Sequence, residues 1–137
     1  MVFIPMHITI KSHPKNLIDI RHLLKTALNE TCLSKQEHGN IVLALDEACS
    51  NIIRHSYKND HTKQIDVDIE LKPGELSITI TDKGKKFDIN SIAVRDITEI
   101  KPGGLGVYII HHVMDEVDYC RTPEGCNKTK LIKKLPD

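Results

Sequence analysis

The sequence predicts an α/β protein of the α+β type, a two-layer sandwich whose mixed, mostly antiparallel sheet carries its helices on one face. Two observations predict this architecture. Residues 63–72 alternate between apolar and acidic side chains, and residues 76–81 alternate between apolar side chains and hydroxyls after a Pro73-Gly74 turn, so a hairpin with one dry face is expected. Residues 17–31 and 41–57 repeat apolar side chains at helical spacing, and such helices cover a dry sheet face.

The chain opens with a strand and a helix. Residues 3–11 form the expected first strand, with apolar side chains at Ile4, Ile8 and Ile10. Ser12-His13-Pro14 favours a helix start, and apolar residues then recur at helical spacing to about Thr31. This helix carries no chemical motif, and we expect it to pack the core.

The stretch around which the rest is organised is the helix expected over Ile41–Tyr57. Ser34 and Glu37 have the spacing of a capping box ahead of it. Its apolar residues lie on one broad arc, whereas Glu47, Asn51 and Arg54 lie on the opposite arc, within roughly 60° of one another. Glu47 and Asn51 are four residues apart, so their side chains lie about 6 Å apart along the helix axis. The simpler alternative is a solvated polar face.

Asp82 ends the second strand of the hairpin and shares the parity of Leu76, Ile78 and Ile80. We therefore expect its carboxylate to face the helices, where it needs a partner because an isolated buried charge is costly. The alternative is an aspartate that caps the following loop. Two residues later, Gly84 either allows a close backbone approach or adopts a positive φ.

A glycine-rich turn, Lys101-Pro102-Gly103-Gly104-Leu105-Gly106, precedes a helix expected over residues 107–114. Free N–H groups at a helix start bind anions, most often phosphate. The turn is neither a Walker A loop nor a dinucleotide fingerprint. Residues 89–100, before it, have weak periodicity and predict a short helix plus a mobile loop. Residues 117–121 and 128–135 predict two closing strands.

Composition narrows the class of protein. At 137 residues, with 39% hydrophobic and 28% charged residues, we expect one soluble globular domain over 1–137. The 19 basic and 19 acidic residues balance, which gives no long-range attraction to nucleic acid or to an anionic membrane. The absence of a membrane-length apolar run and of a signal peptide predicts a cytoplasmic protein. The four cysteines form no C-x-x-C pair, so reduced thiols are expected, and no spacing supports a zinc site.

Three stretches in order carry a resemblance: DEACSNIIRHSY, DKGKKFD and GGLGVYII. Together they resemble the GHKL, or Bergerat, ATP-binding fold shared by DNA gyrase B, MutL, histidine kinases and Hsp-type chaperones. Within that fold, the short chain and the wording of the motifs resemble the anti-sigma-factor serine kinases of the RsbW and SpoIIAB type. The resemblance covers nearly the whole chain, and the three motifs are specific only in combination.

The resemblance implies roles for individual residues. Asn51 matches the asparagine that ligates Mg²⁺, and Glu47 matches the general base one helical turn earlier. Asp82 matches the aspartate that accepts a hydrogen bond from the adenine amino group, and Gly84 matches the glycine against which the base packs. The remaining positions implied for nucleotide binding are Phe87, Gly103, the phosphate loop Gly104, Leu105 and Gly106, and Thr129 near the base; residues 88–102 match a lid that nucleotide should protect from hydrogen exchange.

The sequence departs from the family pattern at two places. Gly103 stands where many relatives have an arginine, and Lys85 and Lys86 replace small residues. The missing arginine leaves the cation for the γ-phosphate open among Arg54, Arg95 and Lys101, and phosphoryl transfer depends on such cations.

The resemblance therefore implies an ATP- and Mg²⁺-dependent serine/threonine kinase and anti-sigma factor. Its expected partners are an anti-sigma-factor antagonist of the STAS type and a sigma factor, with a homodimer also implied. Retention of Glu47 favours this function over a non-catalytic nucleotide-binding anti-sigma module, because binding alone needs only Asn51, Asp82 and the glycines. A detached histidine-kinase ATPase domain is the third alternative, disfavoured because no dimerisation helix bearing a phosphoacceptor histidine precedes the domain.

Overall fold

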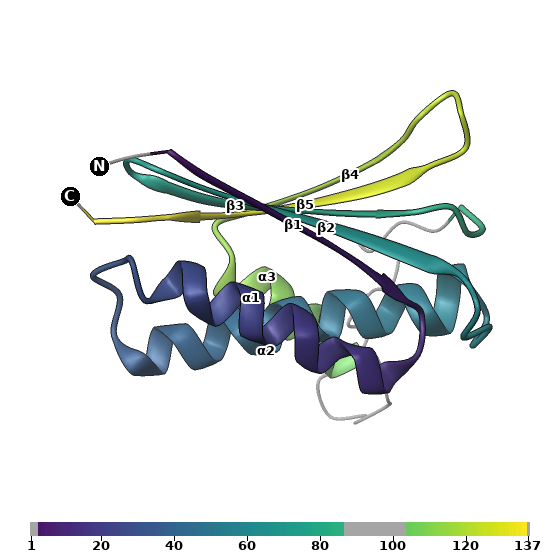
Figure 1. Ribbon diagram of the computed structural model, residues 1–137, viewed down its shortest axis with the longest axis horizontal. Helices are drawn as coiled ribbons and strands as arrows, with labels where there is room; N and C mark the ends of the chain where they lie inside the picture. The colour runs from purple at the N-terminus through teal and green to yellow at the C-terminus, as the bar shows by residue number, and fades with distance from the viewer. Residues whose placement is uncertain (1–2, 87–103, 137) are drawn as a thin grey trace.

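The computed structural model describes residues 3–86 and 104–136 as a two-layer sandwich, with a twisted sheet on one side and three α-helices on the other (Figure 1). The strands follow the order β1-β2-β3-β5-β4, and all four strand pairings are antiparallel. The predicted fold class, with helices on a single face of a largely antiparallel sheet, is confirmed.

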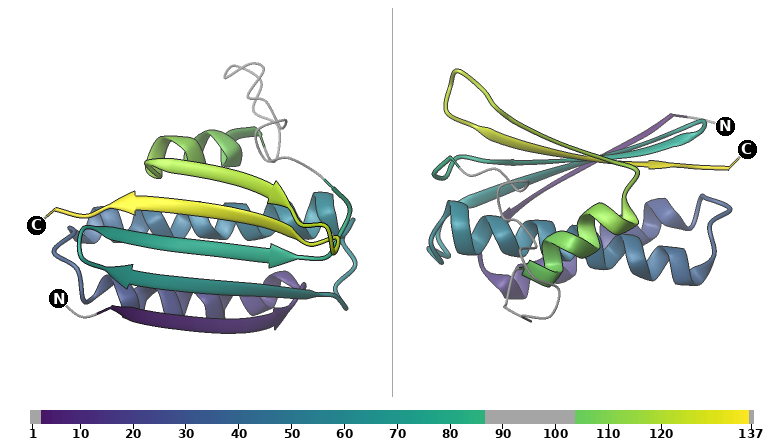
Figure 2. Two further views of the ribbon diagram at one scale, coloured as in Figure 1. Left: turned by 90° about the horizontal axis from the view of Figure 1, so that it is seen from above. Right: turned by 180° about the vertical axis from the view of Figure 1, so that it is seen from behind.

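The elements follow the expected order. The strands are β1 (Ile4–Lys11), β2 (Gln64–Lys72), β3 (Glu75–Asp82), β4 (Glu116–Arg121) and β5 (Asn127–Lys134). The helices are a 3₁₀ turn η1 (Pro14–Asn16), α1 (Leu17–Leu28), α2 (Lys35–Asn51), a π-helical turn η2 (Ile52–Ser56) and α3 (Gly104–Val113). Helix α1 lies beneath β1 and β2, α2 beneath the middle of the sheet, and α3 toward the β4 side (Figure 2).

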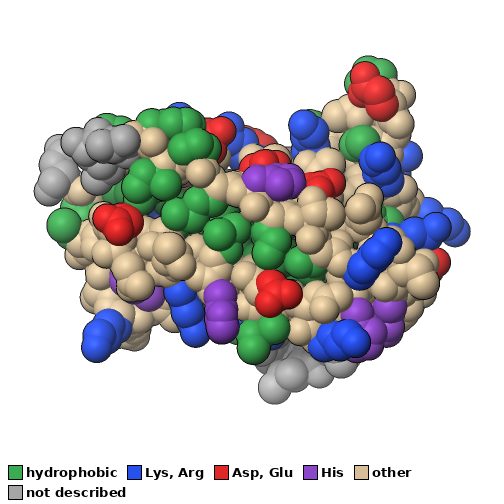
Figure 3. Space-filling view, in the orientation of Figure 1, with side chains coloured by type: hydrophobic (Ala, Val, Ile, Leu, Met, Phe, Trp, Pro, Cys, Tyr) green, Lys and Arg blue, Asp and Glu red, His purple; other side chains and the backbone are tan. Residues whose placement is uncertain are grey.

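The inner face of the sheet forms the core with the helices. The predicted alternation of β2 is observed, because Ile65, Val67, Ile69 and Leu71 are all buried. At the edge strand the covering is thinner: Ile4, Met6 and Ile8 are only partly buried against this core. Viewed from the β1 side, apolar side chains form a band between the two layers (Figure 3).

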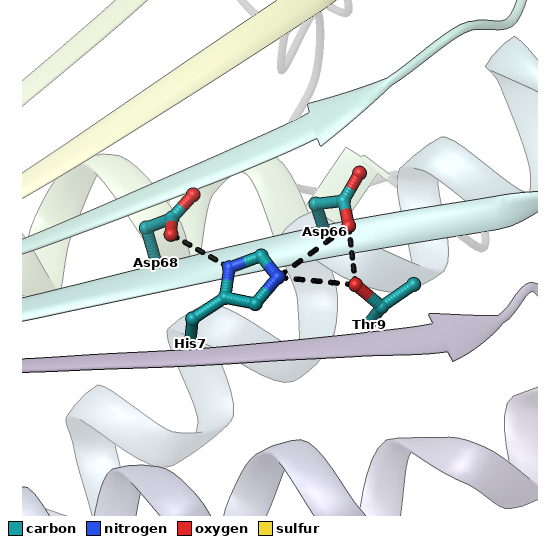
Figure 4. Close-up of polar contacts among 4 residues, drawn as sticks. All are labelled: His7, Thr9, Asp66 and Asp68. Carbon is teal, nitrogen blue, oxygen red and sulfur yellow. Dashed lines mark hydrogen bonds and ion pairs between the residues drawn. The ribbon is translucent and has the colours of Figure 1, made fainter.

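The outer face of the sheet is polar. On it, His7 Nδ1 lies 2.7 Å from Asp68 Oδ1, and Thr9 Oγ1 donates to Asp66 Oδ1 at 2.5 Å (Figure 4). A one-residue slip of register would bury these groups, so the two faces fix the pairing of β1 with β2. In the next pairing, between β2 and β3, Ile65 lies opposite Asp82, the last residue of β3.

Helix α2 begins earlier than its apolar stretch. Ser34 is its N-cap and accepts a hydrogen bond from the Glu37 backbone N–H at 3.1 Å, as the capping-box spacing predicts. At the other end the helix passes into the π-helical turn η2, which the sequence did not predict. Beside the helix, Arg21 of α1 donates through Nε to Asp46 Oδ1 at 2.7 Å, which ties α1 to α2.

The predicted last helix starts earlier than expected, because Gly104 to Gly106 form its first turn rather than a preceding loop. The short helix and mobile loop predicted over residues 89–100, and the predicted lid at 88–102, lie outside the described residues. Within residues 3–86 and 104–136, no helix has the length and apolar character needed to cross a membrane.

Candidate functional site

The polar arc of α2 is not a solvated surface. Asn51 is 0% exposed, although it lies on the arc opposite the apolar residues. Its Oδ1 accepts a hydrogen bond from Arg54 Nη2 at 2.9 Å, whereas its Nδ2 has no partner in the described part of the chain. A buried amide whose NH₂ group lacks a partner is energetically costly. This cost argues against the alternative in which Asn51 is merely a solvated residue on the polar face of the helix.

The second residue of the arc, Glu47, lies against the start of α3. A Cβ atom placed on Gly106 would come within 2.9 Å of Glu47 Cδ, so the Glu47 carboxylate packs directly on this glycine and would have to move if a side chain were added there. The N-terminal turn of a helix carries partial positive charge. Glu47 therefore lies at the junction at which α2 meets the expected phosphate-binding turn.

Two adjacent carboxylates on α2 have different surroundings. Asp46 is engaged by Arg21, and this hydrogen bond raises the pKa of the Arg21 guanidinium. Glu47 makes no ion pair with any described residue. Of the two acids, Glu47 alone is available to a ligand at the α2–α3 junction.

The π-helical turn η2 follows Asn51 directly. The Tyr57 backbone N–H donates to Ile52 O at 2.9 Å, the wider i to i+5 bond of a π-helix, and such turns occur frequently at functional sites. The wider turn brings Ser56 against the segment that follows β3, where the Lys85 backbone N–H donates to Ser56 O at 2.9 Å. It thereby joins the end of α2 to the end of the sheet.

Asp82 faces the helices, as its parity predicts, and is 1% exposed. Its Oδ1 accepts three hydrogen bonds: from Ser56 Oγ, from the Gly84 backbone N–H at 2.9 Å and from Asn127 Nδ2 at 2.9 Å. Its Oδ2 is equally buried but has no partner among the described residues. The bond to Gly84 shows that the aspartate also caps its loop, so both interpretations of Asp82 hold together.

Gly84 is needed for a close approach rather than for a positive φ. A Cβ atom at this position would lie 2.5 Å from Ser56 O and 2.7 Å from Ser56 C. These are backbone atoms, which cannot rotate away as a side chain can. Glycine is therefore the only residue that fits at position 84 without a backbone shift. The glycine therefore lets the turn after β3 pack directly on η2.

Sequence reasoning missed two residues of this corner, Ser56 and Asn127. Both side chains are buried, at 2% and 0% exposure. Asn127 pairs with Asp82 in the β3–β5 register, one residue before the predicted start of that strand. If the predicted strand had begun at Asn127, the alternation of side chains along β5 would have placed Asn127 on the inner face.

Of the other predicted site residues, some lie within the described part of the chain and some lie outside it. Thr129 is 3% exposed and shares the inner face of β5 with Asn127, one inward position further along. Gly104, Leu105 and Gly106 lie in the first turn of α3. Outside the described residues lie Phe87, Lys101 and Gly103, together with Arg95.

A basic cleft of about 900 Å³ lies beside the turn after β3 and includes Asp82, Gly84 and Ser56 in its lining. Six cationic side chains surround it, from Lys11, Lys58, Lys63, Lys83, Lys85 and Arg121. Several Lys and Arg side chains are visible at the right-hand end of the molecule in Figure 3. The candidate site therefore lies beside strongly positive surface in a chain whose net charge is zero.

The two-layer fold, the buried and half-satisfied aspartate and the glycine-rich helix start are features expected of an ATPase domain. The sequence profile of the histidine kinase-like ATPase domain family matches residues 10–133, and the chain belongs to this family. Serine-protein kinase RsbW of Bacillus licheniformis is 29% identical over 106 residues, and that of Staphylococcus aureus is 32% identical over 102 residues. These alignments cover 72% and 67% of this chain, and the chain spans 66% and 64% of the two relatives.

Solved structures support the same fold. The RsbU and RsbW domains of a Mycobacterium tuberculosis protein match with a TM-score of 0.68 and 20% identity, over 96% of this chain and 32% of that one. The SiaB-SiaC complex from Pseudomonas aeruginosa matches with a TM-score of 0.67 and 14% identity, over 93% of this chain and 88% of that one. At these identities the likeness concerns the fold alone.

Proposed function

We propose that this protein is an ATP-binding serine/threonine protein kinase and anti-sigma factor that phosphorylates an antagonist protein of the STAS type. One observation carries the nucleotide assignment: the buried Oδ2 of Asp82, the only atom of that carboxylate without a partner in the described residues. The kinase assignment is supported by the names of the RsbW relatives and by the position of Glu47 at the start of α3.

Adenine suits the unmet atom of Asp82. A carboxylate oxygen only accepts hydrogen bonds, and the exocyclic amino group of adenine donates them. Guanine carries a carbonyl at the same ring position, which would face the carboxylate with no hydrogen between them. The corner should therefore select adenine nucleotides, and the adenine would satisfy an otherwise costly buried group.

The residues at the other end suit a metal-bound phosphate chain. The amide oxygen of Asn51 would hold Mg²⁺, a metal that prefers oxygen ligands and keeps phosphate oxygens and water in its remaining positions. Mg²⁺ would supply positive charge to the phosphates. In the structure Arg54 donates to that same oxygen. Two cations compete for one acceptor, so we expect Arg54 to leave Asn51 when the metal binds and to turn its guanidinium to the phosphates.

The transfer itself needs a base. Glu47 would take the proton of a partner serine as the serine oxygen forms its bond to the γ-phosphorus, while the bond from that phosphorus to the β–γ bridging oxygen breaks and ADP leaves. Arg54 would stabilise the charge that develops on the phosphoryl oxygens, which makes it our choice for the γ-phosphate cation in place of the arginine missing at Gly103.

The proposed partners are proteins. The relatives are named serine-protein kinases, and a neighbour of the same fold is a two-protein complex. We propose a STAS-type antagonist as the substrate, a sigma factor as the alternative partner, and self-association as a homodimer. The action is proposed to be cytoplasmic, without direct contact with nucleic acid or membrane.

The decisive experiment is incubation of the protein with Mg-ATP and a STAS-type domain encoded near its gene, followed by intact-mass detection of phosphate on the partner. A gain of one phosphate on the partner supports the kinase. Binding of ATP and partner without any transfer would favour the non-catalytic anti-sigma module. Failure to bind ATP at all would overturn the proposal.

A further inference from the structure

We propose that Asn127 is a positioning residue that holds the Asp82 carboxylate with one oxygen free, and that Arg121 fixes the direction of its amide. Together the two residues would determine the selectivity of the site for a 6-amino purine over a 6-oxo purine. The inference rests on the proposed function, because it concerns how the site recognises adenine. None of the sequence motifs of the site includes either residue.

The hydrogen bonds around Asp82 are unevenly distributed. All three donors, from Ser56, Gly84 and Asn127, converge on Oδ1, and none reaches Oδ2. A carboxylate held by three donors on one oxygen cannot rotate without breaking all of them. The free oxygen is thereby kept in one place. Asn127 is the only one of the three donors that reaches Asp82 from the neighbouring strand β5.

The direction of the Asn127 amide is set from the other side. Its Oδ1 accepts hydrogen bonds from Arg121 Nη1 and from the Tyr119 hydroxyl, each at 2.7 Å. A guanidinium can only donate. A flipped amide would press its NH₂ group against Arg121 and its oxygen against the Asp82 carboxylate. Arg121 therefore selects the orientation in which the NH₂ group faces Asp82.

The same NH₂ group also holds the turn that follows β3. Asn127 Nδ2 lies 3.1 Å from Lys85 O and 3.3 Å from Gly84 O. Arg121 Nη1 reaches Gly84 O as well, at 3.3 Å. One buried amide thus joins β4, β5 and the turn around the carboxylate, with no exposed surface of its own. The hydrogen bonds of this amide favour one arrangement of the groups around Asp82 Oδ1 and leave Oδ2 without a partner among the described residues.

Base selectivity follows from this arrangement. As long as Oδ2 remains an unprotonated acceptor in a fixed place, a base with an amino group at position 6 gains a hydrogen bond. A base with a carbonyl there meets repulsion between two acceptors. Asn127→Asp would set a second carboxylate beside Asp82, and two like charges in one buried site favour a shared proton. The pair could then donate to a 6-oxo base, so selectivity should fall.

The test compares the binding of ATP and ITP, which differ at position 6, by calorimetry on the full chain. We expect Asn127→Asp and Asn127→Leu to weaken ATP binding about tenfold or more, the usual effect of losing a buried hydrogen bond to a charged group. The ratio of ATP to ITP affinity should fall toward one. Arg121→Leu, at an exposed residue, should lower the ratio less, and Arg121→Lys, which keeps a donor, should largely preserve it.

Two measurements separate positioning from a general loss of structure. In the phosphotransfer assay these variants should raise the KM for ATP and leave kcat at saturating ATP nearly unchanged, because the corner is remote from Glu47. Lys128→Gln changes the exposed residue next along β5 and should alter neither the ratio nor KM. Variants that fold but keep the parental ATP-to-ITP affinity ratio and the parental KM would overturn the inference. If the Asn127 variants do not fold, the result for Arg121→Leu provides the test.

The proposed function and this inference fail in different ways. If the parent does not bind ATP in preference to ITP, or if Asp82→Asn leaves ATP binding unchanged, the adenine assignment itself is wrong. If Asp82→Asn lowers ATP affinity while the Asn127 and Arg121 variants behave as the parent does, the assignment stands and the positioning role is overturned.

Discussion

The two ends of the candidate site are built in different ways. At the proposed adenine end, Ser56, Asp82 and Asn127 come from η2, β3 and β5 and are hydrogen-bonded to one another, and Asp82 Oδ2 has no partner among the described residues. At the proposed phosphate end, the Asn51 side chain is hydrogen-bonded within the described residues only to Arg54, three residues away in the chain, and Glu47 lies against α3. No cross-strand network supports this second end among the described residues.

The difference suggests that the two ends have separate roles, one in recognising the base and one in binding the phosphates. In the proposed function, the base would be recognised by groups held in place by the sheet and by η2, which need not move when the nucleotide binds. The phosphates would be bound by helix side chains that exchange partners, because the oxygen proposed for Mg²⁺ accepts a hydrogen bond from Arg54 in this structure. Variants at the adenine end should therefore change affinity, and variants at the phosphate end should change the chemical step.

The largest effect is expected for Glu47→Ala. The variant should bind Mg-ATP about as well as the parent but transfer phosphate at least ~100-fold more slowly, the usual scale for a lost general base. Single-turnover transfer to the STAS-type partner measures this step directly. Gln36→Ala, at an exposed residue in the first turn of the same helix, is the control. An unimpaired Glu47→Ala enzyme would end the general-base assignment.

The next effect concerns Asp82→Asn at the other end. Replacing one carboxylate oxygen by an NH₂ group removes an acceptor from the adenine amino group, and losing a charged hydrogen bond costs about 1.5–3 kcal/mol, or about 10- to 150-fold in affinity. Calorimetry with Mg-ATP measures the change, and circular dichroism confirms that the variant folds. Equal affinity in a folded variant would show that the base does not bind at this corner.

The sequence predicted the parts of the site that obey a local period. Strand parity put Asp82 on the covered face, and the structure confirms its burial. Helical spacing grouped Glu47, Asn51 and Arg54 on one arc, and in the structure Arg54 donates a hydrogen bond to Asn51. The roles assigned to these residues remain predictions. So do those of residues 87–103, which lie outside the described part of the chain.

The residues that were missed depend on tertiary structure. Ser56 reaches Asp82 only because a π-helical turn changes the direction of the helix after Asn51, and nothing in the local pattern predicts that turn. Asn127 faces Asp82 because the β3–β5 register pairs them, and two strands far apart in the sequence set their register through the whole sheet. Turn residues around Gly125 also made the start of β5 appear one residue late.

A smaller effect is expected on stability. It tests how the turn at Gly84 packs on η2, which connects the two ends of the site. In Gly84→Ala the new methyl group would meet the backbone of Ser56, so the chain must shift and we expect a loss of about 1–3 kcal/mol in the free energy of unfolding. Gly39→Ala is the matched control, since nothing lies within 4 Å of that position in α2 and alanine there should stabilise by up to about 1 kcal/mol. Denaturant unfolding measures both. Equal behaviour of the two variants would mean that the turn does not pack on η2 as described.

The smallest effect concerns His55, which lies in η2 between the two ends. Burial lowers the pKa of His55, and repulsion from Arg54 and Lys58 lowers it further. The folded state therefore favours neutral imidazole. Its contribution to stability is complete above the ordinary pKa of about 6.5 and is lost as the pH falls through the lowered folded value. Replacing His55 by Gln should remove this part of the acid sensitivity, so parent and variant should diverge below about pH 6.5.

The same measurement tests the proposed movement of Arg54. If the guanidinium turns to the phosphates when Mg-ATP binds, one of the charges that lower the pKa of His55 is offset. The pH-dependent difference between the parent and His55→Gln should then become smaller in the presence of Mg-ATP. Unfolding midpoints across pH 5–8, with and without nucleotide, give the comparison, and His111→Gln on the exposed surface of α3 is the control. A difference that Mg-ATP does not change would mean that Arg54 stays on Asn51, and another cation would have to serve the γ-phosphate.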